Sequence, residues 1–304
     1  MKIFGGAFAL HALLLSAAFL SPGCRPGPHS SEAVRVLTVD GGRKLLIEGR
    51  VRAYADTLTW ESRLKYAAVM NIPARFFREP GRMLMICSGA GSIVRNYTKR
   101  KWSVDSAEPD SGITELARDS FGLQDGAGKC YAMDGRAFLE SHGDRYNVIL
   151  EDLVGLRAPD PRLVTAEFFR SVRDHLEPGG VFGVSVECAG WRADIVRSIA
   201  ATLVKEFSKV VVLPIAEPPN RFGSIVLIAV GGEIPGLAQE FDRNAELDPE
   251  WRFGPAYQET HAWDNRFEIS GEEGAIQNDA RNTIAHLFEV VDDSARAQGD
   301  GYLP

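Results

Sequence analysis

The stretch MLMICSGAGSIVRNY, residues 83–97, decides the fold class. Five apolar or near-apolar residues lead into a turn that contains Gly89 and Gly91, and an amphipathic segment follows. This order predicts a buried strand, a tight turn and a helix. The two glycines allow a ligand to approach the backbone closely, beside the amides at the beginning of the helix. We therefore expect an α/β protein in which this turn forms part of a binding site.

The same alternation continues to residue 230. Further apolar runs lie at 102–107, 130–133, 146–152, 179–187, 209–213 and 224–230, and amphipathic segments lie at 92–100, 111–121, 134–142, 165–175 and 192–207. Apolar strands separated by helices predict a mostly parallel sheet with helices on both faces. We expect a Rossmann-like core of the class I methyltransferase type over residues 81–232.

Smaller units flank this core. Residues 34–39 and 44–48 are strand-like, and Asp40-Gly41-Gly42 between them indicates a hairpin. With a helix expected over 58–70, they form a small N-terminal β-hairpin domain, residues 34–80. Residues 233–304 form a C-terminal extension with one amphipathic helix expected over 274–295, which serves either for packing or as a partner surface.

The first 24 residues, MKIFGGAFALHALLLSAAFLSPGC, have the pattern of an export signal. A basic residue precedes an apolar run, and small residues lead to Cys24, which resembles the lipid-attachment site of bacterial lipoproteins. We expect a membrane-associated or exported protein, lipid-anchored at Cys24 and followed by a linker over 25–33. Ordinary cleavage and an uncleaved anchor remain alternatives, and an uncleaved anchor could leave the domain on the cytoplasmic side.

Composition excludes several classes. The 304 residues are 45% hydrophobic and 25% charged, which excludes a disordered, collagen-like or multi-span membrane chain. The net charge of -7 and the scattered basic residues argue against a nucleic-acid partner. Cys87, Cys130 and Cys188 match no zinc spacing, so we expect buried thiols and no metal.

Polar residues follow the next strands in turn. Glu108 ends the second strand, about twenty residues after the glycines, where a carboxylate can accept hydrogen bonds from ribose hydroxyls. Asp134 and Gly135 follow the third strand, where the carboxylate could bind an adenine amino group. Glu151 and Asp152 end the fourth, and only one of them can face a shared pocket. Each carboxylate alone could be a helix cap, but their joint order predicts an adenosyl-ligand site.

The runs 83–97, 104–122, 132–155 and 165–187, together with KLLIEGRVRAY in the hairpin region, resemble the spermidine/spermine synthase family of polyamine aminopropyltransferases. The resemblance covers about residues 34–230 and is closest to divergent bacterial synthase-like members. It implies transfer of an aminopropyl group from decarboxylated S-adenosylmethionine to a small amine, with release of methylthioadenosine. A homodimer is one expected assembly.

The resemblance also assigns residues. It places Gly89 and Gly91 on the nucleoside and amino-acid side of the donor, Glu108 on the ribose, and Asp134 with Gly135 near the adenine. It places Asp152 on the catalytic strand-end Asp, where it would accept the proton of the attacking amine.

Several positions depart from the family pattern. Ala90 replaces an Asp that helps to bind the aminopropyl amine, Gly155 replaces the second Asp of the catalytic Asp-x-x-Asp stretch, and Arg52 replaces a Gln. The Tyr-His pair of the next helix reads as Lys65-Tyr66. Two alternatives therefore stay open: a methyltransferase that uses S-adenosylmethionine, and a catalytically silent, membrane-anchored binding protein.

Overall fold

The computed structural model describes residues 34–124, 126, 128–156, 158–216, 218–232 and 254–298, with side chains to residue 294. The expected export segment, Cys24 and the linker lie outside these residues, so the predictions about them stay predictions. None of the helices in the described ranges is long and apolar enough to cross a bilayer.

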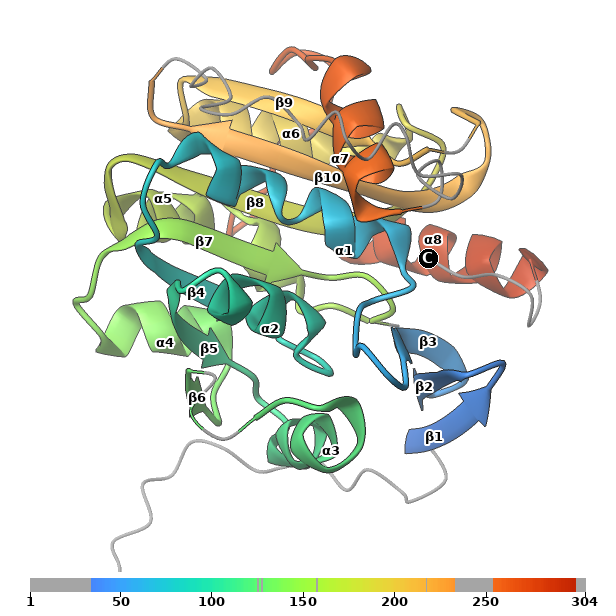
Figure 1. The fold of residues 1–304 in the computed structure, drawn as a ribbon. Helices are drawn as coiled ribbons and strands as arrows, with labels where there is room; N and C mark the ends of the chain where they lie inside the picture. Colours follow the sequence, from blue (N-terminus) through green and yellow to red (C-terminus); the bar gives the residue numbers. More distant parts are fainter. Residues whose placement is uncertain are drawn as a thin grey trace, which may run out of the picture.

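A small antiparallel sheet, which we call the N-terminal sheet, begins the described chain (Figure 1). Its strands are β1 (Val34–Val39), β2 (Gly42–Ile47) and β3 (Arg50–Asp56). The predicted hairpin is present, with Asp40 and Gly41 in the turn at positive φ. The third strand, β3, was not predicted as a separate strand, and it is the one that contributes to the site described below.

The prediction of a helix over 58–70 is wrong for its first half, because α1 begins only at Lys65. Asp56 Oδ1 accepts hydrogen bonds from the amides of Leu58 and Thr59, at 2.8 and 3.0 Å, and Trp60 has a φ of 60°. This turn competes with helix formation, since a side-chain acceptor satisfies the amides that a helix would use. Within residues 58–76, only α1 (Lys65–Val69) and a 3₁₀ segment, η1 (Ile72–Phe76), are helical.

The main sheet has seven strands in the order β6-β5-β4-β7-β8-β10-β9. Strands β4 to β8 pair in parallel, whereas β10 is antiparallel to both of its neighbours. This confirms the Rossmann-like, mostly parallel sheet. The strand bounds are β4 (Arg82–Ile86), β5 (Ser103–Ala107), β6 (Lys129–Tyr131), β7 (Tyr146–Asp152), β8 (Leu176–Ala189), β9 (Lys209–Pro214) and β10 (Phe222–Val230).

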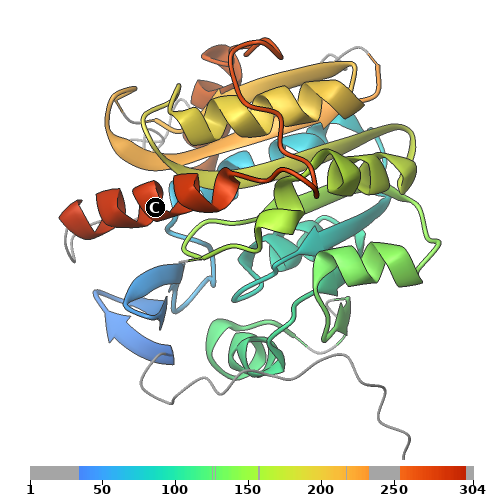
Figure 2. The same ribbon diagram turned by 180° about the vertical axis from the view of Figure 1, so that it is seen from behind.

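Helices cover both faces of the main sheet. Figure 1 shows α1, α2 (Ser92–Lys99) and α7 (Pro255–Asp264) on the near face. Figure 2 shows α4 (Gly135–Ser141), α5 (Ala166–Asp174), α6 (Asp194–Glu206) and α8 (Ile284–Gln298) on the other. A 3₁₀ segment, η2 (Pro161–Val164), precedes α5. The two faces carry separate apolar cores, as expected for strands buried on both sides.

Helix α3 (Ser111–Phe121) joins the two sheets. Its Ile113 and Phe121 share a small apolar cluster with Leu45 and Ala53 of the N-terminal sheet and with Ala90 of the glycine turn. This cluster holds β3 against the turn between β4 and α2, and it therefore brings the N-terminal sheet to the expected site.

The C-terminal extension packs on the core. Phe267 forms an isolated bridge with Val212 of β9, and Arg75 Nε donates to Glu259 Oε2 of α7 at 2.5 Å. Helix α7 was not predicted, and the helix expected over 274–295 begins only at Ile284. Residues 274–283 instead form a loop in which Asn278 and Arg281 bridge each other. These contacts support the packing interpretation of the extension.

Candidate active site

The carboxyl ends of β4, β5, β6 and β7 lie at one edge of the main sheet, where ligands bind in folds of this type. The turn after β4 is tight: Cys87, Gly89 and Gly91 have φ values of 60°, 52° and 75°, and the Gly91 amide donates to the Ser88 carbonyl at 3.0 Å. Gly91 is the N-cap of α2, and no side chain caps the first amides of this helix.

Glu108 binds this turn directly. Its Oε2 accepts a hydrogen bond from the Gly89 amide at 3.0 Å, and its Oε1 accepts one from the Asp110 amide at 3.3 Å. Burial raises the pKa of Glu108, while the charge of Arg52 acts in the opposite direction. The predicted proximity of the acid to the glycines is present, and each oxygen keeps a lone pair for a ligand hydroxyl.

Asp134 caps α4. Its Oδ1 accepts a hydrogen bond from the Ala137 amide at 2.9 Å, so the helix-cap alternative considered for this residue is the observed contact. Gly135 begins α4 where any Cβ would collide with Ile86 of β4. The glycine therefore lets α4 approach the strand closely, and binding of an adenine by Asp134 stays a prediction.

Asp152 and Glu151 point to opposite faces of β7, as predicted. The Asp152 carboxylate has four donors. Ser185 Oγ and the Val154 amide donate to Oδ1 at 2.8 and 3.1 Å, and Tyr66 Oη donates to Oδ2 at 3.0 Å. Arg52 Nη1 forms an ion pair with the same Oδ2 at 3.1 Å. These four donors hold the carboxylate in one orientation.

Glu151 has a different environment. Its side chain is fully buried, and neither carboxylate oxygen has a hydrogen-bond partner among the described residues. Burial raises the pKa of Glu151 well above its ordinary value, and the charges of Asp152 and Asp160 add to the effect. Burial therefore favours the protonated form of Glu151, on the face of β7 whose core includes side chains of α4 and α5.

Arg52 reaches the same point from β3. Its Nη2 donates to the carbonyls of Cys87 and Asp152, at 2.7 and 3.1 Å, and its Nη1 donates to the Val154 carbonyl. Burial disfavours the charge on this guanidinium, but Asp152, with smaller contributions from Tyr66 and Glu108, raises the pKa of Arg52 above its usual value. Arg52 is therefore a permanent buried cation that ties β3 to the ends of β4 and β7.

A pocket, which we call the Arg52 pocket, lies between β3, α1 and the glycine turn. Its lining includes Arg52, Tyr66, Gly89, Ala90, Ser92 and Asp152. The hydroxyl oxygen of Ser92 is buried there and has no hydrogen-bond partner among the residues that the structure describes. An unpaired buried hydroxyl is unfavourable by itself, so a ligand that satisfies it would gain affinity. Of the titratable groups that line the pocket, sequence reasoning had assigned a role only to Asp152.

Gly155 explains why the second acid of the Asp-x-x-Asp stretch is absent. Its φ is 73°, and a Cβ there would lie 2.5 Å from the Val51 carbonyl oxygen and 3.0 Å from Arg52 Cα. The loop after β7 thus packs directly on the backbone of β3, and no side chain fits between them.

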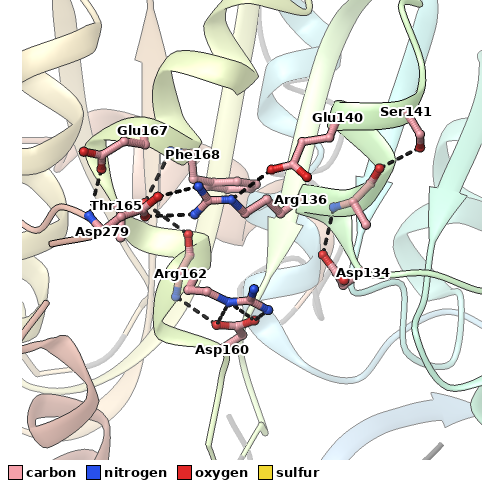
Figure 3. A network of polar contacts seen from close by, with 11 residues as sticks. Asp134, Arg136, Glu140, Ser141, Asp160, Arg162, Thr165, Glu167, Phe168 and Asp279 are labelled. Carbon is pink, nitrogen blue, oxygen red and sulfur yellow. Dashed lines mark hydrogen bonds and ion pairs between the residues drawn. The ribbon is translucent and has the colours of Figure 1, made fainter. Parts of the chain in front are cut away.

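Further polar contacts surround Asp134 (Figure 3). Arg136 of α4 forms two hydrogen bonds with the Asp279 carboxylate, at 2.8 and 2.5 Å, and Thr165 Oγ1 donates to Asp279 Oδ1 at 2.9 Å. Asp160, the N-cap of η2, pairs with Arg162 in the same segment beside them. The C-terminal extension is thereby fixed beside the expected adenine position, a contact that nothing in the sequence signalled.

Comparison with known families identifies the fold and the reaction class. Residues 64–232, more than half of the chain, match the spermine/spermidine synthase domain. The chain belongs to the spermine/spermidine synthase family. It is therefore a transferase of the polyamine aminopropyltransferase type at the level of the family, and the resemblance noted in its sequence is confirmed.

Individual relatives are distant. The polyamine aminopropyltransferase of Moorella thermoacetica is 24% identical over 221 residues, which cover 70% of this chain and 73% of that protein. The polyamine aminopropyltransferase of Nitrosomonas europaea is 25% identical over 173 residues, which cover 54% of this chain and 53% of that protein. Spermidine synthase 1 of Hyoscyamus niger is 24% identical over 169 residues, covering 53% and 52%. The chain thus spans about half the length of the last two.

Solved structures support the fold assignment. A probable spermidine synthase from Corynebacterium glutamicum superposes with a TM-score of 0.61 at 18% identity, covering 73% of this chain and 84% of that one. The spermidine synthase of Thermotoga maritima superposes with a TM-score of 0.59 at 18% identity, covering 76% of this chain and 81% of that one. A spermidine synthase in complex with the transition-state analogue AdoDATO gives 0.57 with the same identity and coverage.

In the described part of the chain, no three His, Cys, Asp or Glu side chains lie close enough together to hold a metal ion.

Proposed function

We propose that this protein transfers an alkyl group from an adenosyl sulfonium donor to an amine. By analogy with its family, the group is aminopropyl, the donor is decarboxylated S-adenosylmethionine, and the released product is methylthioadenosine. One observation carries the proposal: Glu108 and Gly89 are in contact at the carboxyl edge of the main sheet, next to a pocket that Asp152 lines.

The proposed chemistry needs a positioned amine and a proton acceptor. The amine nitrogen attacks the methylene carbon next to the sulfonium, the new C–N bond forms, and the C–S bond breaks with its electron pair on sulfur. Asp152 is the carboxylate of the pocket lining, and we assign it the proton that the amine loses. Gly89, Gly91 and Glu108 would hold the ribose side of the donor, and Asp134 and Gly135 would lie near the adenine.

Isothermal titration of the full chain with methylthioadenosine, decarboxylated S-adenosylmethionine and S-adenosylmethionine tests the adenosyl site. We expect binding, and we expect Glu108→Gln to weaken methylthioadenosine by about tenfold because a charged acceptor of ribose hydroxyls is lost. Glu115→Gln, on the exposed face of α3, is the matched control. Failure of all three nucleosides to bind would refute the proposal.

Product analysis with putrescine tests the transfer itself. Asp152→Asn should abolish release of methylthioadenosine while leaving its affinity nearly unchanged, and an unchanged rate would show that another group takes the proton. Methyl transfer from S-adenosylmethionine is the second candidate, favoured by Ala90 and Arg52 in the pocket lining. It would release S-adenosylhomocysteine in the same assay.

A further inference from the structure

The loop of residues 277–283, which we call the extension loop, lies outside residues 64–232, the part of the chain that matches the family domain. It is nevertheless packed into the core. Gln277 is only 1% exposed. Its amide donates to Thr202 Oγ1 of α6 at 3.0 Å, and its carbonyl accepts a hydrogen bond from the Ala166 amide of α5 at 2.9 Å. The extension loop therefore begins inside the layer that α5 and α6 form.

Asp279 of this loop joins α4 to α5 beside the expected adenine position (Figure 3). Arg136, two residues after Asp134 in the first turn of α4, donates to both Asp279 oxygens, at 2.8 and 2.5 Å. Thr165, the buried N-cap of α5, donates to Asp279 Oδ1 at 2.9 Å. The Asp279 amide donates to Glu167 Oε2 at 3.0 Å. Since a two-point guanidinium–carboxylate contact fixes orientation as well as distance, these bonds hold the beginnings of the two helices in one arrangement.

The extension loop also holds the segment that precedes α5. Asn282 Nδ2 donates to the carbonyl of Pro161 in η2 at 2.7 Å. Hydrogen bonding to Asp160 raises the pKa of the neighbouring Arg162, and the charge of Asp134 adds to the effect, so Arg162 and Asp134 lie near each other. The loop is thus bonded to both segments that border the expected adenine position, α4 at its first turn and η2.

We propose that Asp279 is a positioning residue of the adenosyl site, which acts through Arg136 on the carboxylate of Asp134. The inference rests on the proposed function and deepens it by naming what sets recognition of the base. The hydrogen bond recorded for Asp134 within the described chain, from the Ala137 amide, uses Oδ1 and leaves Oδ2 for the adenine amino group. Because a hydrogen bond weakens steeply as it departs from linearity, a rotation of the first turn of α4 would lower affinity for adenine.

Titration of the full-length protein with methylthioadenosine and methylthioinosine measures this recognition. The 6-amino donor of the first is a 6-oxo acceptor in the second. Methylthioadenosine should bind about 10- to 100-fold more tightly, because a hydrogen bond to a charged group contributes about that factor. Asp134→Asn, which can still cap α4, should remove most of this preference. An unchanged preference in that variant would overturn the inference. If methylthioadenosine itself does not bind, the proposed function fails instead.

Asp279→Ala should reduce the preference for methylthioadenosine by about fivefold to tenfold, because displacement of a positioned group by about 1 Å can cost about 100-fold. A variant that only lowers the folded fraction weakens both nucleosides equally, so the ratio of affinities separates positioning from stability. Glu273→Ala is the matched control. It removes the Arg192–Glu273 ion pair of the same extension, at 3.1 Å, and the Asp279 and Glu273 side chains are 39% and 38% exposed. It should keep the wild-type ratio, and equal ratios in the two variants would refute the role of Asp279.

A double-mutant cycle tests whether Asp279 acts through Arg136. Arg136→Ala, Asp279→Ala and the double variant should reduce the preference by the same factor, since either substitution removes the same contact. Asp279→Asn, which keeps an acceptor for Thr165 Oγ1 and for one N–H of Arg136, should recover part of the preference. Additive losses in the double variant would show that Asp279 does not act through Arg136 and would overturn the inference.

Discussion

Replacing Gly155 by alanine should destabilise the protein through a collision with β3. Two costs are expected. A φ of 73° places a Cβ in the left-handed region, which costs about 1–2 kcal/mol. The same Cβ would lie 2.5 Å from the Val51 carbonyl oxygen, a backbone atom that cannot rotate away, and overpacking of this kind costs about 1–3 kcal/mol. The sum is about 2–5 kcal/mol of unfolding free energy.

Gly179→Ala is the matched control. Its φ is 77°, almost the same as that of Gly155, but no atom lies within 4 Å of its hypothetical Cβ. It should therefore show the conformational cost alone. Urea unfolding followed by circular dichroism measures both variants, and the difference between them isolates the collision.

Equal destabilisation by the two substitutions would refute the packing of the loop on β3. The same reasoning predicts that Gly155→Asp, which recreates the Asp-x-x-Asp stretch, does not restore affinity for a diamine. The space that the second acid would need is filled by the backbone of Val51 and Arg52.

Two other substitutions test buried and bridging carboxylates. Because burial raises the pKa of Glu151, the native state keeps a proton that the unfolded chain releases, so unfolding free energy should fall as pH rises above about 4.5. Glu151→Gln should make the fall of unfolding free energy with pH shallower, by up to about 1.4 kcal/mol per pH unit. Urea unfolding between pH 5 and 8 measures this slope. An unchanged slope would contradict a protonated Glu151 in the native state. Asp279→Ala removes the acceptor of Arg136 and Thr165. Because these contacts are partly exposed, we expect the unfolding free energy to fall by about 1 kcal/mol. We also expect faster proteolytic cleavage within residues 265–283. Asp264→Asn is the control. Equal cleavage rates for the two variants would argue against a role of Asp279 in holding the C-terminal extension on the core.

Local pattern predicted most of the main sheet. The apolar runs became β4, β5, β7, β8, β9 and β10 nearly at their expected bounds, and α3 runs over the predicted residues 111–121. Strands buried on both faces have a strong local signal, because almost every side chain must be apolar. The predicted helices over 58–70 and 274–295 failed in part, because the Asp56 turn and the Asn278–Arg281 bridge use the backbone differently.

The candidate site likewise has features that were predictable from local pattern and features that were not. Local pattern was enough to predict that a glycine turn, Glu108, Asp134 and Asp152 follow successive parallel strands, since strand order and alternation place such residues at one edge. The contacts of these residues depend on how the two sheets pack together. Arg52 meets Asp152 across one hundred residues of chain, and Gly155 lies against β3, because α3 holds the N-terminal sheet on the glycine turn. Contacts so distant in sequence depend on how the two sheets pack, and no local pattern encodes them.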